Sequence, residues 1–187
     1  MKNNYLFKLL FISSLIGSES VESKIDNFFS SVNDKTINLI VLNQEKNIPA
    51  SLSIDNNVIF FDTIDFDSTI TKIQNNSIFT YDLKNERLII ENSEENFLNF
   101  FYNNNFKDYY MINKSIFRKT YRVIYSNNIN TLEIDFDEDL DKVSKIKLIQ
   151  DKNIFFDVKI LDVLEFNDPI KNLILTNDWK TIDWRVE

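Results

Sequence analysis

Acidic clusters are the only candidates for a reactive site that this sequence offers. The chain has 29 Asp and Glu residues but neither His nor Cys, which excludes imidazole catalysis, thiolate chemistry and zinc–thiolate sites. Its single glycine, Gly17, excludes the glycine-rich loops that cradle phosphate. The remaining candidates are Asp62 with Asp65 and Asp67, and the run of residues 135–141.

Alternating carboxylates of this kind could bind Ca²⁺. Neither cluster has the glycine or the ligand glutamate of an EF-hand loop, and a solvated hairpin tip is the alternative reading of residues 135–141. A carboxylate pair for glycoside hydrolysis is also compatible with so many acids, but no pattern singles out two of them. We therefore expect a protein that is not an enzyme and that has no metal site and no cofactor.

Composition and charge restrict the class of protein further. A length of 187 residues with 43% hydrophobic residues is typical of one globular domain. The net charge of −8 has the wrong sign for binding nucleic acid or an anionic membrane. We expect no nucleic-acid partner.

The N-terminal residues have the order of a secretory signal peptide. A polar start with Lys2 is followed by the short apolar run Leu9–Gly17 and then by the small residues Ser18 and Ser20. The apolar run is too short to span a bilayer. We predict a signal peptide over residues 1–20 and an exported domain over residues 21–187; a buried N-terminal helix is the alternative.

One amphipathic helix precedes a long series of strands. Ile25, Phe28, Phe29 and Val32 recur at helical spacing and predict a helix over Val21–Val32. After it the apolar period becomes two. The predicted strands are Thr36–Leu42, Ile48–Ile54, Val58–Asp62, Thr69–Ile73, Ser77–Tyr81, Arg87–Glu91, Lys119–Tyr125, Thr131–Phe136, Ser144–Ile149 and Ile154–Phe166.

The breaks between these strands are short and rich in Asn and Asp. In the absence of glycine, these residues are the ones best able to adopt positive φ in tight turns. Tight turns reverse the chain, whereas a parallel crossover needs about 12 or more residues. The pattern therefore predicts an antiparallel, largely sequential sheet.

A second short helix is predicted in the middle of the strand series. Ser93 is a suitable N-cap, and Glu94 and Glu95 suit the first turn. The aromatic-rich residues that follow include Phe97, Leu98, Phe100 and Phe101. Composition fits equally a lid over the mouth of a barrel and a packing helix that closes one end of the core.

Alternation along the later strands separates an apolar face from a polar one. In Ile154–Asp162, the residues Phe156, Val158 and Ile160 point one way, and Asp157 and Lys159 point the other. Leu132, Ile134 and Phe136 alternate in the same manner with Glu133 and Asp135. Such a sheet, bent on itself, presents a concave apolar surface that helices or a lipid must cover. The alternative is an ordinary core filled by side chains.

The order of elements resembles that of the periplasmic outer-membrane lipoprotein carriers, the LolA family. The hairpin over Ile70–Asp82, which ends in Tyr-Asp, looks like the hairpin of that family. The segments 132–137, 146–148 and 156–158 resemble its C-terminal meander. Asp168-Pro169 and Leu173–Leu175 fall where the family has a Pro-containing loop and a last strand.

This resemblance implies a mainly antiparallel β fold, an incomplete half-open β-barrel covered by the N-terminal helix and an inserted lid helix. It implies a monomeric periplasmic carrier that takes acylated lipoprotein cargo from an inner-membrane releasing complex to an outer-membrane acceptor. The implied lipid-binding residues are Phe60, Phe61, Phe97, Leu98, Phe100, Phe101, Leu132, Ile134, Phe136, Phe156, Val158 and Ile160.

The sequence departs from the family at one position. The family usually has an arginine in an early strand that hydrogen-bonds to the lid, and here Phe60 lies at or beside that position, with no arginine before Arg87. An apolar side chain cannot make those hydrogen bonds. Two further readings therefore stay open: a LolA-like binder of another lipid or glycolipid, and an envelope scaffold protein without a ligand.

Overall fold

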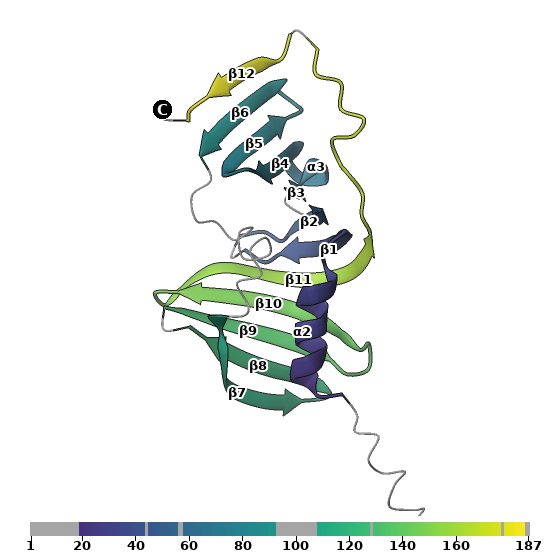
Figure 1. The fold of residues 1–187 in the computed structure, drawn as a ribbon, viewed down its shortest axis with the longest axis vertical. Helices are drawn as coiled ribbons and strands as arrows, with labels where there is room; N and C mark the ends of the chain where they lie inside the picture. Colours follow the sequence, from purple (N-terminus) through teal and green to yellow (C-terminus); the bar gives the residue numbers. More distant parts are fainter. Residues whose placement is uncertain are drawn as a thin grey trace, which may run out of the picture.

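The computed structural model describes residues 19–43, 45–55, 58–92, 108–127, 129–176 and 178–185, without the side chains of residues 64 and 65. These residues form one twelve-stranded sheet, two helices and connecting turns (Figure 1). The elements are α2 (Val21–Ser31), β1 (Lys35–Val41), β2 (Ile48–Asp55), β3 (Val58–Asp62), α3 (Ile64–Asp67), β4 (Thr69–Gln74), β5 (Ser77–Asp82), β6 (Arg87–Asn92), β7 (Tyr110–Phe117), β8 (Thr120–Ser126), β9 (Asn130–Asp137), β10 (Lys142–Gln150), β11 (Asn153–Glu165) and β12 (Lys180–Asp183).

The predicted N-terminal helix is confirmed and ends one residue earlier than expected. Ser20 is its N-cap, and the Ser20 hydroxyl accepts a hydrogen bond of 3.2 Å from the Ser23 N–H. This bond satisfies one of the N–H groups that the first turn of a helix leaves without a partner. Glu22 in the first turn also suits the positive end of the helix dipole.

Two meanders meet at the centre of the sheet. Strands β1 to β6 follow one another as antiparallel neighbours, as do β7 to β11. Strand β1 pairs antiparallel with β11, with Lys35 opposite Glu165 and Leu39 opposite Ile160. This pairing joins residues more than a hundred positions apart and makes one continuous sheet (Figure 1).

The prediction of a mainly antiparallel β fold is confirmed, and each predicted strand is present with ends shifted by only a residue or two. The sheet is open, since β12 and β7 stand at its two ends in the described part of the chain. An open sheet is consistent with a half-open barrel. The predicted lid helix, with Phe97, Leu98, Phe100 and Phe101, lies outside the described residues.

One edge of the sheet departs from the predicted antiparallel order, and two strands, β7 and β12, were not predicted. Strand β12 pairs parallel with β6, with Lys180 opposite Arg87. No tight turn connects these two strands, so nothing forces them to run in opposite directions. Residues 173–175, expected as the last strand, are not in a strand. Strand β7 was missed, although it pairs along its length with β8.

Register and burial divide the sheet into two faces. The front face carries α2, and its buried side chains form one cluster, the front-face cluster: Ile25, Phe29, Val32, Ile37, Leu39, Leu52, Ile54, Ile59, Ile73, Val123, Tyr125, Leu132, Ile134, Phe136, Val143, Ile146, Leu148, Phe156, Val158 and Ile160. The back face of β3 to β6 buries a smaller set, Phe60, Ile70, Tyr81 and Ile90.

In the part of the chain that the structure describes, neither helix is both long and apolar enough to cross a membrane.

Candidate functional site

Six of the predicted lipid-binding residues lie together in the front-face cluster. Leu132, Ile134 and Phe136 come from β9, and Phe156, Val158 and Ile160 come from β11; all six are buried. Strand β10 lies between these strands and contributes Leu148, opposite both Leu132 and Phe156, and Ile146, opposite both Ile134 and Val158. The alternation of the sequence thus builds an unbroken apolar surface across three strands.

The other face of the same strands is polar, as the alternation predicted. Arg122 donates two hydrogen bonds to Asp135, of 2.7 Å from Nε and 2.8 Å from Nη2. This pairing with Asp135 raises the pKa of Arg122. Lys145 Nζ lies 3.0 Å from a carboxylate oxygen of Asp157. The back face of these strands therefore carries paired charges, whereas their front face is apolar.

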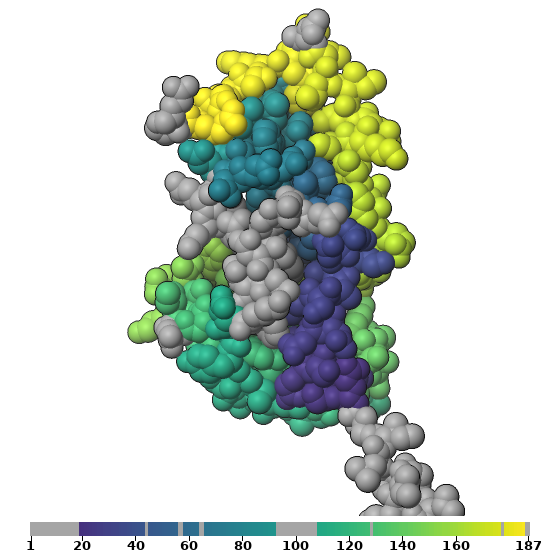
Figure 2. All heavy atoms as spheres, in the orientation of Figure 1, coloured from purple at the N-terminus to yellow at the C-terminus, as the bar shows by residue number. Residues whose placement is uncertain are grey.

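Helix α2 lies across the front of strands β8 to β11 (Figure 1). Its buried side chains Ile25, Phe29 and Val32 belong to the front-face cluster, while Glu22, Asp26 and Ser30 occupy other sides of the helix. In the space-filling view the helix is a purple ridge beside the green strands (Figure 2). Within the described residues, α2 is the one helix that contributes buried side chains to this cluster.

Two ion pairs hold the first turns of α2 to the sheet. Lys114 of β7 donates a 2.9 Å hydrogen bond to the Glu22 carboxylate, and this bond holds the pKa of Glu22 below its usual value. Lys24 pairs with Asp141 in the turn between β9 and β10, and this hydrogen bond raises the pKa of Lys24. Both pairs are partly or largely exposed, so solvent screens them and neither contributes much to stability.

A groove of about 320 Å³ runs along one flank of α2. Phe28 and Ser31 of the helix line one side, and Phe136, Val143 and neighbouring residues of the sheet line the other. Phe136 and Val143 belong to the front-face cluster. Both residues are nearly fully buried, and Glu19, Lys24, Asn27, Asp141 and Lys142 complete the lining, so the groove marks the edge of the covered apolar surface.

The structure separates Phe60 and Phe61, although both were predicted to bind lipid. Phe61 lies on the front face and packs against the front-face cluster. Phe60 lies on the back face, where it is buried with its ring 6.4 Å from that of Phe166. Successive residues of a strand point to opposite faces, so these two side chains cannot line one surface.

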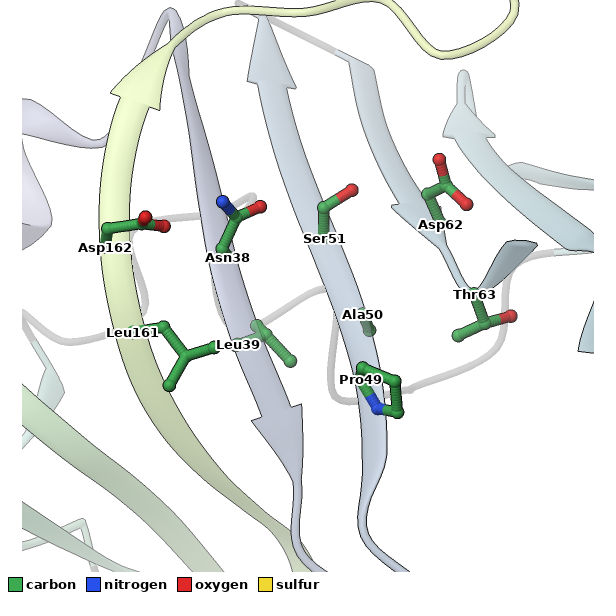
Figure 3. A pocket seen from close by; sticks show the side chains of 9 residues that line it. All are labelled: Asn38, Leu39, Pro49, Ala50, Ser51, Asp62, Thr63, Leu161 and Asp162. Atoms are coloured by element: carbon green, nitrogen blue, oxygen red, sulfur yellow. The ribbon is translucent and has the colours of Figure 1, made fainter. Parts of the chain in front are cut away.

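A second, polar groove lies on the back face, with a volume of about 460 Å³. Asp162, Asn38, Ser51 and Asp62 stand opposite one another on four adjacent strands, β11, β1, β2 and β3, and form a row (Figure 3). Leu39, Pro49, Ala50, Thr63 and Leu161 complete the lining. The side chains in this row are carboxylates, a hydroxyl and an amide. The groove is therefore better suited to a polar ligand than to an acyl chain.

The acidic clusters singled out in the sequence have structural partners. Asp67 accepts hydrogen bonds from the Thr63 and Thr69 hydroxyls, of 2.6 Å and 2.7 Å, and fastens the short turn around α3. Asp135 pairs with Arg122, whereas Asp139 pairs with Lys119. Over the described positions, no three acidic side chains come close enough together to hold a metal ion.

A comparison with solved structures shows that another protein has a similar fold. The structure is similar to that of an uncharacterized conserved protein from Thermus thermophilus, with a TM-score of 0.55 and 11% identity over 88% of this chain and 99% of the other. It also aligns with MucB at a TM-score of 0.31 and 8% identity, over 87% of this chain and 66% of the other. No family model matches the sequence, and no curated protein matches it.

Sequence reasoning missed the residues that fasten α2. Glu22 and Lys24 lie outside the apolar positions that predicted the helix, and Lys114 lies in β7, which was not predicted. Glu22 and Lys114 are 92 positions apart. No local pattern signals such a pair, because the topology of the sheet alone brings β7 beside the start of α2.

Proposed function

We propose that this protein is an exported, monomeric carrier that binds the acyl chains of lipoproteins against the front-face cluster. It would receive its cargo from an inner-membrane releasing complex and pass it through the periplasm to an outer-membrane acceptor. The observation that carries the proposal is the continuous apolar surface that α2 covers, with a groove at its edge beside Phe28, Phe136 and Val143. The resemblance of the sequence to the LolA family supports a lipoprotein as the cargo and the periplasm as the location.

Burial of an acyl chain gives the physical reason for such a surface. Each CH₂ group that leaves an apolar environment for water costs about 0.8 kcal/mol, so an acylated protein needs a covered apolar site to cross an aqueous space. Displacement of α2 would expose the cluster formed by β9, β10 and β11. The two exposed ion pairs at its N-terminal end are weak enough to break and re-form.

A cross-linking experiment tests whether the chain enters beneath α2. The protein has no cysteine, so Glu22→Cys with Lys114→Cys introduces a unique thiol pair at a position where the two native side chains touch. A short bismaleimide would then fasten the helix to β7. The same double variant treated with N-ethylmaleimide is the matched control, since it loses the ion pair and stays unlinked.

Binding is measured with a synthetic triacylated lipopeptide and with the same peptide lacking acyl chains. We expect the control to bind only the acylated form and the cross-linked protein to lose that binding. Equal binding by the cross-linked protein would contradict entry beneath α2. Native mass spectrometry of protein purified from its own envelope then separates the cargoes: an acylated peptide supports the proposal, whereas a free lipid or glycolipid, or no guest at all, overturns it.

A further inference from the structure

Large apolar side chains are exposed at both ends of strands β7 to β11; Ile116, Phe117 and Leu140 lie at one end among charged residues, and a second set lies at the other end. Ile129 in the β8–β9 turn is 66% exposed, and Ile154, directly after the β10–β11 turn, is 55% exposed. Tyr110 and Met111, at the start of β7, are 55% and 48% exposed. We name Tyr110, Met111, Ile129, Ile154 and the half-exposed Phe155 the apolar rim.

The register of the sheet places these residues at a single end. Tyr110, Ser126, Thr131, Ile149 and Ile154 stand opposite one another in turn and form a row across five strands. Ile129 directly precedes the first residue of β9. At about 4.8 Å between neighbouring strands, the row is roughly 19 Å long and ends at the β10–β11 turn (Figure 1).

Charge is distributed unequally between the two ends of these strands. The described charged residues at the rim end are three, Asp108 just before β7 and the pair Asp151 and Lys152 in the β10–β11 turn, together with neutral Asn, Ser, Thr and Gln residues. The turns at the other end are densely charged: Arg118, Lys119, Asp137, Glu138, Asp139, Asp141 and Lys142. Desolvation of charged groups is costly, so only the rim end can enter an apolar medium cheaply.

We propose that the apolar rim inserts into the interfacial layer of an electrically neutral lipid bilayer. Apolar side chains project from the surface in or beside separate turns, and the β8–β9 and β10–β11 hairpins are about 10 Å apart because their centres are two strand spacings from each other. A fluid bilayer can surround such separate projections. The next row inward, Leu132, Leu148 and Phe156, points to the front face, whereas Ile149 and Ile154 in the outer row point to the back face.

This inference goes beyond the proposed carriage of acyl chains, because the rim would contact a bilayer whether or not a guest occupies the front face. The net charge of −8 sets the lipid preference. Repulsion from anionic headgroups opposes insertion and is screened by salt. Binding should therefore be strongest to neutral bilayers and weaker to anionic ones at low ionic strength.

The test is co-flotation of the full chain, without cargo, with vesicles of phosphatidylcholine and phosphatidylethanolamine. Ile129→Asp and Ile154→Asp are compared with Leu140→Asp, a matched control whose side chain is 62% exposed at the opposite end of the same strands. Burial of one isoleucine side chain is worth enough that each rim variant should bind about tenfold more weakly or worse. The Leu140 variant should bind like the unmodified chain.

Circular dichroism and thermal unfolding establish that all three variants are folded. Added phosphatidylglycerol should reduce vesicle binding, and salt should restore part of it. Absence of binding by the unmodified chain, or equal losses in the rim variants and the Leu140 variant, would overturn the inference. Vesicle binding that persists in both rim variants would assign the contact to another surface, and binding of a protein partner alone would also overturn it.

Discussion

The variant Ile25→Ala tests whether α2 can leave the sheet without unfolding it. Ile25 is fully buried against the front-face cluster, and an isoleucine-to-alanine change at such a site costs about 2 to 5 kcal/mol. Burial of Ile25, Phe29 and Val32 stabilises the docked helix by roughly 5 to 9 kcal/mol. The two exposed ion pairs add little to this. The substitution therefore removes a large fraction of the free energy that holds α2.

If α2 opens independently of the sheet, the loss falls on docking, and the open population should rise roughly 30-fold or more. A guest that binds only the open form should gain apparent affinity in proportion. Amide hydrogen exchange measures the opening: protection should fall in Val21–Ser31 and persist in β9 and β10. Lipopeptide affinity should increase in the same variant.

Ile59→Ala is the matched control, because Ile59 is also fully buried in the front-face cluster but lies in β3. It should reduce protection throughout the sheet without an increase in lipopeptide affinity. If Ile25→Ala lowers protection in β9 and β10 as much as in α2, then the helix is part of the cooperative core. In that case the front face is not a site that α2 uncovers.

Three further outcomes follow from single contacts. Arg122→Ala should lower the free energy of unfolding in urea by about 1 to 3 kcal/mol, because it leaves the Asp135 carboxylate, whose side chain is only 12% exposed, without its partner. Asp135→Asn should lower the free energy of unfolding by less, since the half-exposed guanidinium of Arg122 can regain water. Equal losses in the two variants would contradict this. Phe60→Ala should lower stability by about 3 to 5 kcal/mol, because Phe60 is buried, and should leave lipopeptide binding by the folded protein unchanged. A loss of binding without a loss of stability would show that Phe60 does contact lipid. Because the pKa of Glu22 is lowered, its carboxylate stabilises docking of α2 at pH values above the ordinary pKa of 4.5, and this contribution is lost as the pH falls through the pKa of the folded state. Amide protection of α2, measured between pH 6 and pH 3, should therefore fall more steeply in the unmodified chain than in Lys114→Met.

Local patterns were sufficient to predict ten of the twelve strands and most of the hairpins. Asn75 and Asn76 both adopt positive φ in one turn, and Asp151 and Lys152 do so in another, as two-residue hairpin turns require. The turn between β7 and β8 has the same geometry but consists of Arg118 and Lys119. Two long basic side chains are not a turn signal, so β7 was overlooked together with the hairpin.

Long-range arrangement could not be obtained from the same patterns. The antiparallel pairing of β1 with β11 and the parallel pairing of β12 with β6 connect segments that no short turn joins. By contrast, the separation of Phe60 from Phe61 could have been predicted, because the alternation of side chains along a strand already places neighbouring residues on opposite faces. The two residues were grouped because the family resemblance implied both, without regard to this alternation.

The cap of α2 stands at the boundary of the predicted signal peptide, and this position has a consequence for maturation. Peptidase cleavage on the carboxyl side of Ser20 would remove the hydroxyl that accepts the Ser23 N–H, at a cost of about 1 kcal/mol. It would also leave an ammonium group on Val21, at the end of the helix where positive charge is unfavourable. The first turn would then fray, so α2 of a chain cleaved there would dock on the sheet less tightly than α2 of the uncleaved chain.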